Sequence, residues 1–383
     1  METEIKKNKE NNKEVELKEK NKIEKNIAVI KGDGIGPEII DRTIDILKKI
    51  EKKYSHRFNL EYVDMGGCSI DKYGVPLTDE NLEKCLKSDA VLLGSVGGYK
   101  WDNVASENRP ERGLLKLRKE MNLYANIRPT KIFKPLEYAS PLKINECDII
   151  DFVIVRELTG GIYFGNHYFE TVDNIRQASD IMIYREDEIK RIGKVAFELA
   201  KKNKKNITSV DKANVLYSSK LWREIMNDLS KEYIEIEYND MYVDNAAMQI
   251  IANPSQFGII VTENMFGDIL SDEASMLAGS IGMSPSASLS DSSVGMYEPI
   301  HGSAPDIAGK DIANPIGAIL SLAMMFRYSF NLFEEAEEIE KAVNKSIEEG
   351  YRTLDLMPKD KELSHKFKKV GCSEMGNIIM SKI

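Results

Sequence analysis

The segment from residue 26 to residue 51 constrains the fold of this chain most. It begins with the apolar run N-I-A-V-I, continues through the glycine-rich turn K-G-D-G-I-G-P-E, and ends in a helical pattern from Ile39 to Glu51. Pro37 suits the first turn of a helix, and Glu38 lies where the helix dipole favours an acidic side chain. A strand, a glycine-rich turn and a helix in this order predict the opening of an α/β fold.

The glycine-rich turn resembles a dinucleotide-binding fingerprint but differs from it in spacing. Gly32, Gly34 and Gly36 give G-x-G-x-G-P instead of G-x-G-x-x-G/A, and no clear acidic ribose ligand follows about 20 residues later. We therefore expect a tight strand-to-helix turn beside an active-site cleft. A true Rossmann phosphate loop is the lesser alternative.

Short apolar strands and amphipathic helices follow along the chain. The predicted strands span residues 90–94, 149–155 and 258–262, and the predicted helices span 81–87, 186–202, 219–229, 313–326 and 332–350. A length of 383 residues exceeds the usual limit for one core. Two domains, or one core split by an insertion, are expected.

Composition excludes several classes of protein. The net charge of -9 argues against a general nucleic-acid-binding protein, although it permits a local basic pocket. No stretch approaches the roughly 18 apolar residues of a transmembrane helix, so no membrane association is expected. The four cysteines (Cys68, Cys85, Cys147 and Cys372) show no C-x-x-C spacing, which predicts reduced thiols in a cytoplasmic protein.

Residues 1–24 form a charged segment of Lys, Glu and Asn. This segment lacks the apolar stretch of a secretory signal and the arginines of an organelle transit peptide. We interpret it as a disordered, solvated tail, with a partner-binding arm as the alternative.

Three aspartates are candidate metal ligands. Asp268 and Asp272 are four residues apart, so in a helix both carboxylates lie on one face and repel each other unless a cation compensates. Asp244 is a third candidate. Carboxylates without nearby Cys or His favour Mg²⁺ or Mn²⁺. A solvated acidic helix face is the alternative explanation.

Three arginines are candidate ligands of an acidic substrate. Arg156 ends an apolar run, where α/β proteins commonly place ligand contacts. Arg118 and Arg128 supply two further guanidinium groups, and such groups bind carboxylates in bidentate fashion. The set suits a dicarboxylic acid, although surface ion pairs explain most arginines.

Two further residues could transfer protons, and one loop could bind a cofactor. Tyr163 lies in a glycine-flanked aromatic cluster, and Lys212 follows S-V-D, although each taken alone is more commonly structural. The loop H-G-S-A-P-D-I-A-G from His301 lets backbone groups approach a flat or phosphorylated ligand. Asp306 could accept hydrogen bonds from an adenosine ribose and would repel a 2′-phosphate, which favours NAD.

Together these motifs resemble the β-decarboxylating dehydrogenases, the isocitrate/isopropylmalate dehydrogenase family. The resemblance rests on K-G-D-G-I-G-P-E, on R-E-L-T-G-G-I-Y-F-G from Arg156, on N-M-F-G-D-I-L-S-D from Asn264 and on the His301 loop, and it covers residue 25 to the C-terminus. It implies the family's two-domain α/β fold with a central active-site cleft, which is not a conventional Rossmann domain. Residues 25–123 and 279–383 would form the first domain, and residues 124–278 an inserted second domain carrying a homodimer interface.

The resemblance also implies a role for each candidate residue. Arg118, Arg128 and Arg156 would hold the carboxylates of a substituted malate. Asp268 and Asp272 would bind Mg²⁺ or Mn²⁺ together with Asp244 of the partner subunit, which would also contact the substrate. Lys212, also from the partner, would be the base, and Tyr163 would reprotonate the product, so that the active sites of the dimer are shared.

Substrate and cofactor preference follow from fewer residues within this resemblance. Leu114 and Val215 would form an apolar wall, which favours the isopropylmalate branch and oxidative decarboxylation to 4-methyl-2-oxopentanoate in leucine biosynthesis, because a third carboxylate would be buried there without a partner. Glu111 would lie near the nicotinamide ribose. The remaining NAD ligands would be His301, Gly302, Ser303, Ala304, Pro305, Asp306, Ile307 and Asn314. Tyr99, where Pro is common in the family, and Arg112, where Thr is frequent, are departures that leave local loop detail open.

Two alternatives remain open. A sister enzyme acting on tartrate, D-malate or homoisocitrate is less favoured because of Leu114. A catalytically inactive regulatory subunit would be expected to lack a metal aspartate, Lys212 or Tyr163, and all of them are present.

Overall fold

The structure is a computed structural model, and it describes residues 22–142 and 150–383. Most of the predicted charged tail and Cys147 lie outside the described residues. Cys68, Cys85 and Cys372 are free thiols, as predicted. None of the described helices is both long and apolar enough to cross a bilayer.

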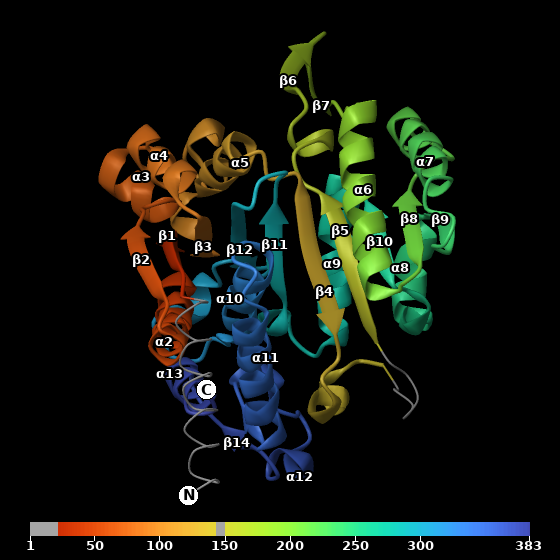
Figure 1. Cartoon of the computed structure of the whole chain (residues 1–383). Helices are drawn as coiled ribbons and strands as arrows, with labels where there is room; N and C mark the ends of the chain where they lie inside the picture. The colour runs from red at the N-terminus through yellow and green to blue at the C-terminus, as the bar shows by residue number, and fades with distance from the viewer. Residues whose placement is uncertain (1–21, 143–149) are drawn as a thin grey trace, which may run out of the picture.

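A ten-stranded mixed sheet runs through the described part of the chain (Figure 1). Its strands are, in spatial order, β2 (Arg57–Tyr62), β1 (Glu24–Gly32), β3 (Ala90–Ser95), β12 (Gly295–Pro299), β11 (Pro285–Leu289), β4 (Ala125–Lys131), β5 (Asp151–Glu157), β10 (Ile259–Thr262), β8 (Ile207–Asp211) and β9 (Tyr238–Tyr242). The first four strands are mutually parallel, and so are the last four. Strands β11 and β4 are antiparallel to their neighbours and join the two parallel sets.

Helices cover both faces of this sheet. The central strands lie between α6 (Glu186–Asn203), α10 (Ile316–Tyr328) and α11 (Phe333–Glu348) on one face and α9 (Asn264–Leu277) with α8 (Val243–Ala252) on the other (Figure 1). The remaining helices are α2 (Gly36–Tyr54), α3 (Gly67–Tyr73), α4 (Asp79–Lys87), α5 (Pro110–Glu120), α7 (Tyr217–Ser230), α12 (Lys361–Ser364) and α13 (Cys372–Met380). Short 3₁₀ turns are η1 (Tyr99–Trp101), η2 (Ser106–Asn108), η3 (Lys134–Ala139), η4 (Gly161–Tyr163), η5 (Pro254–Gln256), η6 (Ile281–Met283), η7 (Pro305–Ile307) and η8 (Leu354–Leu356).

Helix α10 shows how local chemistry sets a boundary. The pattern predicts a helix from residue 313, but the helix begins at Ile316. A residue before proline avoids the helical region, and Asn314 precedes Pro315. The Asn314 side chain instead accepts a hydrogen bond from the Ile316 amide at 3.0 Å.

The register of three parallel strands positions the candidate site. Thr262 of β10 is opposite Arg156 of β5 on one side and Val210 of β8 on the other. The carboxyl ends of these strands therefore lie at one edge of the sheet, where Lys212 follows β8 and Asn264 follows β10. Parallel α/β sheets place ligand contacts at such an edge.

The two predicted domains do not have separate large sheets in the described structure. One sheet extends across both predicted parts, and β11 pairs with β4 from residue 287 to residue 289. The domain boundaries therefore stay a prediction.

Two small two-stranded sheets lie outside the large one. One pairs β13 (Tyr351–Arg352) with β14 (Lys368–Lys369), and the other is a hairpin of β6 (His167–Val172) and β7 (Ile175–Asp180). The hairpin projects from the rest of the molecule (Figure 1), and every residue in its strands is exposed.

Candidate active site

Arg156 is the centre of a buried polar cluster between β5 and α9. Its side chain is 2% exposed, and its guanidinium forms an ion pair with Asp268. Its Nε and one terminal nitrogen donate to the Asn264 side-chain oxygen at 3.0 and 2.7 Å. The Asn264 amide group in turn donates to the Gly160 carbonyl at 3.0 Å. A Cβ at Gly267 would lie 2.7 Å from the Arg156 side chain, so this glycine lets the arginine pass against α9.

Arg128 reaches the same cluster from the neighbouring strand β4. Its Nε donates to the Asn126 side-chain oxygen at 2.6 Å, and one terminal nitrogen donates to Ser271 Oγ at 2.6 Å. That terminal nitrogen also lies 3.5 Å from Asp268 and 3.7 Å from Asp272. The two aspartates thus lie one turn apart on the same side of α9, as their spacing predicted.

The charges in this cluster shift one another's pKa values. Burial lowers the pKa of Arg156 to about 10 and also lowers that of Arg128. Burial alone would raise the pKa of Asp268, but Arg156 and Arg128 outweigh it, so the pKa of this carboxyl lies below its usual range. At Asp272 burial prevails and raises the pKa.

Tyr163 joins the cluster from η4. Its hydroxyl donates to Asp268 at 3.0 Å, and the Arg156 guanidinium carbon lies 5.8 Å from its ring centroid. Burial and the Asp268 charge raise the pKa of the phenol, so Tyr163 is protonated at neutral pH. The residue therefore has a proton to donate at the place where the substrate is predicted to bind.

Arg118 lies on α5 and forms an ion pair with Glu298 of β12 at 2.8 Å. Its Nε is buried and has no hydrogen-bond partner within residues 22–142 and 150–383. A buried donor without a partner costs free energy unless a ligand satisfies it. Arg118 is thus positioned to bind an added acceptor.

Lys212 and Asp244 form a separate pair. Lys212 follows β8, Asp244 lies in the first turn of α8, and the Lys212 ammonium donates to the Asp244 carboxylate at 2.7 Å. This hydrogen bond lowers the pKa of Asp244, whose side chain is 64% exposed. Val215 follows in the same loop and is 62% exposed. Among the described residues, no hydrogen bond or ion pair joins Lys212 or Asp244 to the Arg156 cluster.

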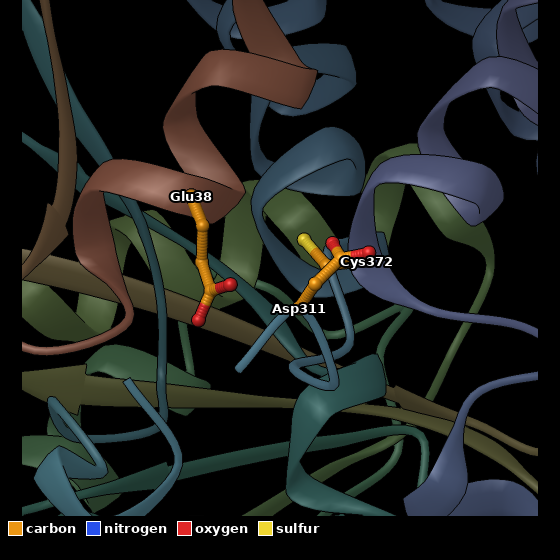
Figure 2. Close-up of side chains that lie close together, drawn as sticks. All are labelled: Glu38, Asp311 and Cys372. Carbon is orange, nitrogen blue, oxygen red and sulfur yellow. The ribbon is translucent and has the colours of Figure 1, made fainter. Parts of the chain in front are cut away.

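A different group of side chains lies within metal-binding distance in the described residues. Glu38, Asp311 and Cys372 bring one ligand atom each to within 4.8 Å of one another (Figure 2). Burial raises the pKa of Cys372 to about 12, so the sulfur is a neutral thiol and a poor ligand. The Cys372 amide donates to the Asp311 carbonyl at 3.0 Å, and the docking of α13 accounts for their proximity.

The predicted cofactor loop borders a cavity of about 450 Å³. His301, Gly302, Ala304, Ile307 and Asn314 line this mostly apolar space together with Asp355. His301 Nδ1 contacts the Gly302 carbonyl at 2.9 Å, whereas its buried Nε2 has no partner in the described structure. Such a cavity has room for a flat ring and one polar contact.

The glycine-rich turn after β1 supports this loop. The Ile35 amide donates to the Ser303 carbonyl at 2.8 Å, and the Gly36 amide donates to the Asp33 carbonyl at 2.9 Å. Gly34 has a φ of 59°, and a Cβ there would lie 2.0 Å from the Ser303 carbonyl oxygen. Protein acceptors therefore occupy amides that a Rossmann loop would offer to phosphate, which favours the predicted tight turn.

Several predicted residues lie at other edges of the site. Glu111 and Tyr163 line a cavity of about 290 Å³ together with Leu115. Leu114 is partly buried and packs against a core cluster that includes Leu117 of α5, whereas Val215 is 62% exposed. Exposed Asp306 accepts a hydrogen bond from Tyr99 at 3.4 Å, so one of the departures from the family pattern contacts the predicted ribose ligand.

Four polar residues in this site had no predicted role. They are Asn126, Asn264, Ser271 and Glu298, which hold the three arginines. Asn264 begins the helix that carries Asp268, and Glu298 is the charged residue of a strand that is buried throughout. A charged residue inside a predicted strand, such as Glu298, is the one sequence signal that could have predicted an oppositely charged partner such as Arg118.

Comparison with known proteins places the chain in a class. Residues 26–379 match the family described as isocitrate/isopropylmalate dehydrogenase. Two curated relatives named 3-isopropylmalate dehydrogenase are those of Clostridium acetobutylicum (54% identical, covering 93% of this chain and 99% of the relative) and Bacillus subtilis (53%, covering 87% and 92%). The crystal structure of isocitrate dehydrogenase from Methylococcus capsulatus is 33% identical with a TM-score of 0.82 and covers 93% of this chain and 98% of that one.

The α/β fold and the arginine–aspartate cluster therefore belong to a dehydrogenase. The chain is a member of the isocitrate/isopropylmalate dehydrogenase family, and the predicted resemblance is confirmed.

Proposed function

We propose that this chain catalyses the NAD-dependent oxidative decarboxylation of (2R,3S)-3-isopropylmalate to 4-methyl-2-oxopentanoate and CO₂. The observation that carries the proposal is the convergence of the Arg128 and Arg156 guanidinium groups and the Tyr163 hydroxyl on Asp268. It combines sites for carboxylates with a proton donor. Relatives bearing the name 3-isopropylmalate dehydrogenase, at 53–54% identity over most of the chain, support this substrate over tartrate, D-malate and homoisocitrate.

The charge balance of the cluster supports a divalent cation. Arg118, Arg128 and Arg156 face three carboxylates, those of Glu298, Asp268 and Asp272, so the described site is close to neutral. A dianionic substrate would leave this buried site with two uncompensated negative charges unless a divalent ion accompanied it.

The donor set fits Mg²⁺ or Mn²⁺. Asp268 and Asp272 offer carboxylate oxygens from one side of α9, and they would hold the ion together with Asp244 of the partner subunit. When bound, the ion would supply Lewis-acid polarisation of the substrate hydroxyl and its neighbouring carboxylate.

The protein groups would divide the remaining work. The arginines would bind and orient the two malate carboxylates, and one donor would be Arg118 Nε, which has no partner within the described part of the chain. Lys212 of the partner subunit would accept the hydroxyl proton, and NAD, when bound, would supply the hydride acceptor. After CO₂ is lost, the Tyr163 hydroxyl donates its proton to carbon.

NAD would lie along the His301–Asn314 loop. The mostly apolar cavity of about 450 Å³ suits an adenine ring, and His301 Nε2, which has no partner among the described residues, would supply a polar contact. Asp306, exposed at the edge of the loop, would accept hydrogen bonds from the ribose hydroxyls and would repel a 2′-phosphate.

In a homodimer with shared active sites, the Lys212–Asp244 pair of one subunit would complete the Arg156 cluster of the other. Among the described residues, no hydrogen bond or ion pair joins Lys212 or Asp244 to the Arg156 cluster. Helices α8 and α9 carry exposed apolar side chains, among them Met248 (61%) and Ile269 (60%). The projecting hairpin adds Phe169 (74%) and Ile175 (71%). Exposed apolar surfaces of this kind mark protein interfaces. We expect this dimer to act in the cytoplasm, without nucleic acid or membrane partners.

The test is NADH formation from 3-isopropylmalate with Mg²⁺ or Mn²⁺. We expect the rate to exceed those with D-malate, tartrate and homoisocitrate, to vanish with EDTA and to return with added metal. Faster turnover of any other acid would contradict the proposed substrate. Retained activity after complete chelation would contradict the proposed metal.

A further inference from the structure

We propose that Arg191 is a positioning residue for the substrate-binding arginine Arg156, although it lies on the opposite face of the sheet. The inference rests on the proposed function. Arg156 and Glu157 are consecutive on β5, so their side chains leave opposite faces, Arg156 toward α9 and Glu157 toward α6. Arg191 belongs to α6, which packs against that second face (Figure 1).

The Glu157 carboxylate holds the turn that follows β5. Its side chain is fully buried and accepts hydrogen bonds from the Thr159 amide (3.1 Å), the Thr159 hydroxyl (3.0 Å) and the Gly160 amide (2.7 Å). Arg191 is the cation beside this group, 3.5 Å from the carboxylate, and it also donates to the Thr159 hydroxyl at 2.7 Å. Arg191 therefore fixes the turn at two points.

A chain of hydrogen bonds connects this turn to Arg156 on the other face of the sheet. The Gly160 carbonyl accepts from the Asn264 amide group, and the Asn264 oxygen accepts two hydrogen bonds from Arg156. The turn then continues directly into η4, which carries Tyr163. A loosened turn would release the orientation of Asn264, and with it the guanidinium that binds substrate.

Arg191 also ties the turn to two segments remote in sequence. It donates to the Asn122 side chain at 3.3 Å and lies 4.5 Å over the ring of Tyr124, whose hydroxyl donates to Asp291 at 2.6 Å. Asn122 and Tyr124 lie in the connection into β4, the strand that carries Arg128. One side chain thus braces the strands of both buried arginines.

The surroundings make this brace unusual for a surface arginine. Arg191, Tyr124 and Asp291 line an open cavity of about 1160 Å³, yet the Arg191 side chain is 27% exposed and its Nε is buried without a partner in the described chain. The planar guanidinium donates two hydrogen bonds, lies beside the Glu157 carboxylate and stacks over a ring at once, which a lysine could not reproduce.

The experiment compares Arg191→Met, Arg191→Lys and Thr159→Val with wild type in steady-state assays with 3-isopropylmalate and NAD. Lys194→Met is the matched control, because Lys194 lines the same cavity on the same helix. We expect Arg191→Met to lower kcat about tenfold and to raise KM for isopropylmalate with little change in KM for NAD, since misplaced binding groups cost up to ~100-fold in rate. Arg191→Lys should recover part of the loss, and Lys194→Met should match wild type.

Two results would overturn the inference. One is a lowered melting temperature for Arg191→Met with kcat and both KM values within about twofold of wild type, which indicates a merely structural residue. The other is an equal rise in both KM values. If Arg191→Met fails to fold, Thr159→Val, which removes one hydroxyl, tests the inference in its place: kcat should fall and KM for isopropylmalate should rise, with KM for NAD unchanged. Inactive wild type would instead contradict the proposed function itself.

Discussion

The Arg156 cluster and the Lys212–Asp244 pair contain the same kinds of charged groups in opposite settings. The Arg156 side chain is 2% exposed and pairs with buried partners, whereas the Asp244 side chain is 64% exposed and, among the described residues, pairs with Lys212. Both regions lie at the carboxyl ends of neighbouring parallel strands. The Arg156 cluster is thus held together by internal contacts, while under the proposed dimer the Lys212–Asp244 pair would serve the site of a second subunit.

Removing one carboxylate from each region should show this difference most strongly. Asp268→Asn should lower kcat/KM by about 10³-fold, because the proposed metal ligand and the counter-charge of two arginines are lost. It should also destabilise the fold by about 2 kcal/mol, less than the ~3–5 kcal/mol of a fully buried pair because the Asp268 side chain is 36% exposed. NADH assays and urea unfolding measure the two effects.

Asp244→Asn is the matched control for that variant. It should also abolish activity, but its melting temperature should stay within about 1 °C of wild type because exposed ion pairs add little stability. Equal destabilisation by both substitutions would break the comparison.

Mixed dimers test whether the exposed pair serves a second subunit. Asp268→Asn and Lys212→Ala should each be nearly inactive alone. Co-refolding equal amounts should restore about a quarter of wild-type activity, since half of the dimers are mixed and each mixed dimer contains one intact site. Activity that stays at the level of the single variants would show that Asp268 and Lys212 act within one chain.

The main residues of the Arg156 cluster could be predicted from the sequence, but the side chains that hold its arginines could not. The i, i+4 spacing of Asp268 and Asp272 and the apolar run before Arg156 are local signals, and the structure has both features. The partners of the arginines were not predicted, because they depend on tertiary register. Arg118 and Glu298, for example, are 180 residues apart in the chain.

The projecting hairpin was missed for a different reason. Its strands are exposed on both faces, so they carry no alternating apolar pattern. The sequence did contain one signal, the consecutive Asp173 and Asn174, which are residue types that tolerate left-handed geometry. In the structure they have φ values of 52° and 63°, as a two-residue hairpin loop requires. Elements with a buried apolar face could therefore be predicted from the sequence. The hairpin could not, because its apolar side chains are exposed in one chain and we expect a partner subunit to cover them.

Glu263 lies between the two regions and should make stability depend on pH. It precedes Asn264 and accepts a hydrogen bond from Ser219 of α7, the helix after the Lys212 loop. Burial raises its pKa to about 7, so the folded state holds this proton more tightly than the unfolded chain does. Stability from this group is full below the unfolded pKa of about 4.3 and falls as pH rises to about 7.

Glu263→Gln should remove that loss. We expect the free energy of unfolding at pH 8 to rise by about 2 kcal/mol, below the ~4 kcal/mol that the full shift would give, with little change at pH 5. Urea unfolding at both pH values measures this, and Glu224→Gln, at an exposed position on α7, is the control. An unchanged difference between pH 5 and pH 8 in Glu263→Gln would contradict the assignment.

The smallest expected effect concerns Val215, on the exposed side of the comparison. In one chain this side chain is 62% exposed, so its truncation should leave folding unchanged. If it completes the partner's apolar wall, Val215→Ala should lower kcat/KM for 3-isopropylmalate about fivefold, the cost of about 1 kcal/mol of lost apolar contact. D-malate has no isopropyl group and should be turned over as by wild type, which makes it the internal control. Equal losses with both acids would mean that the loop positions Lys212 and does not recognise the substrate's side chain, and the exposed region would then contribute chemistry alone.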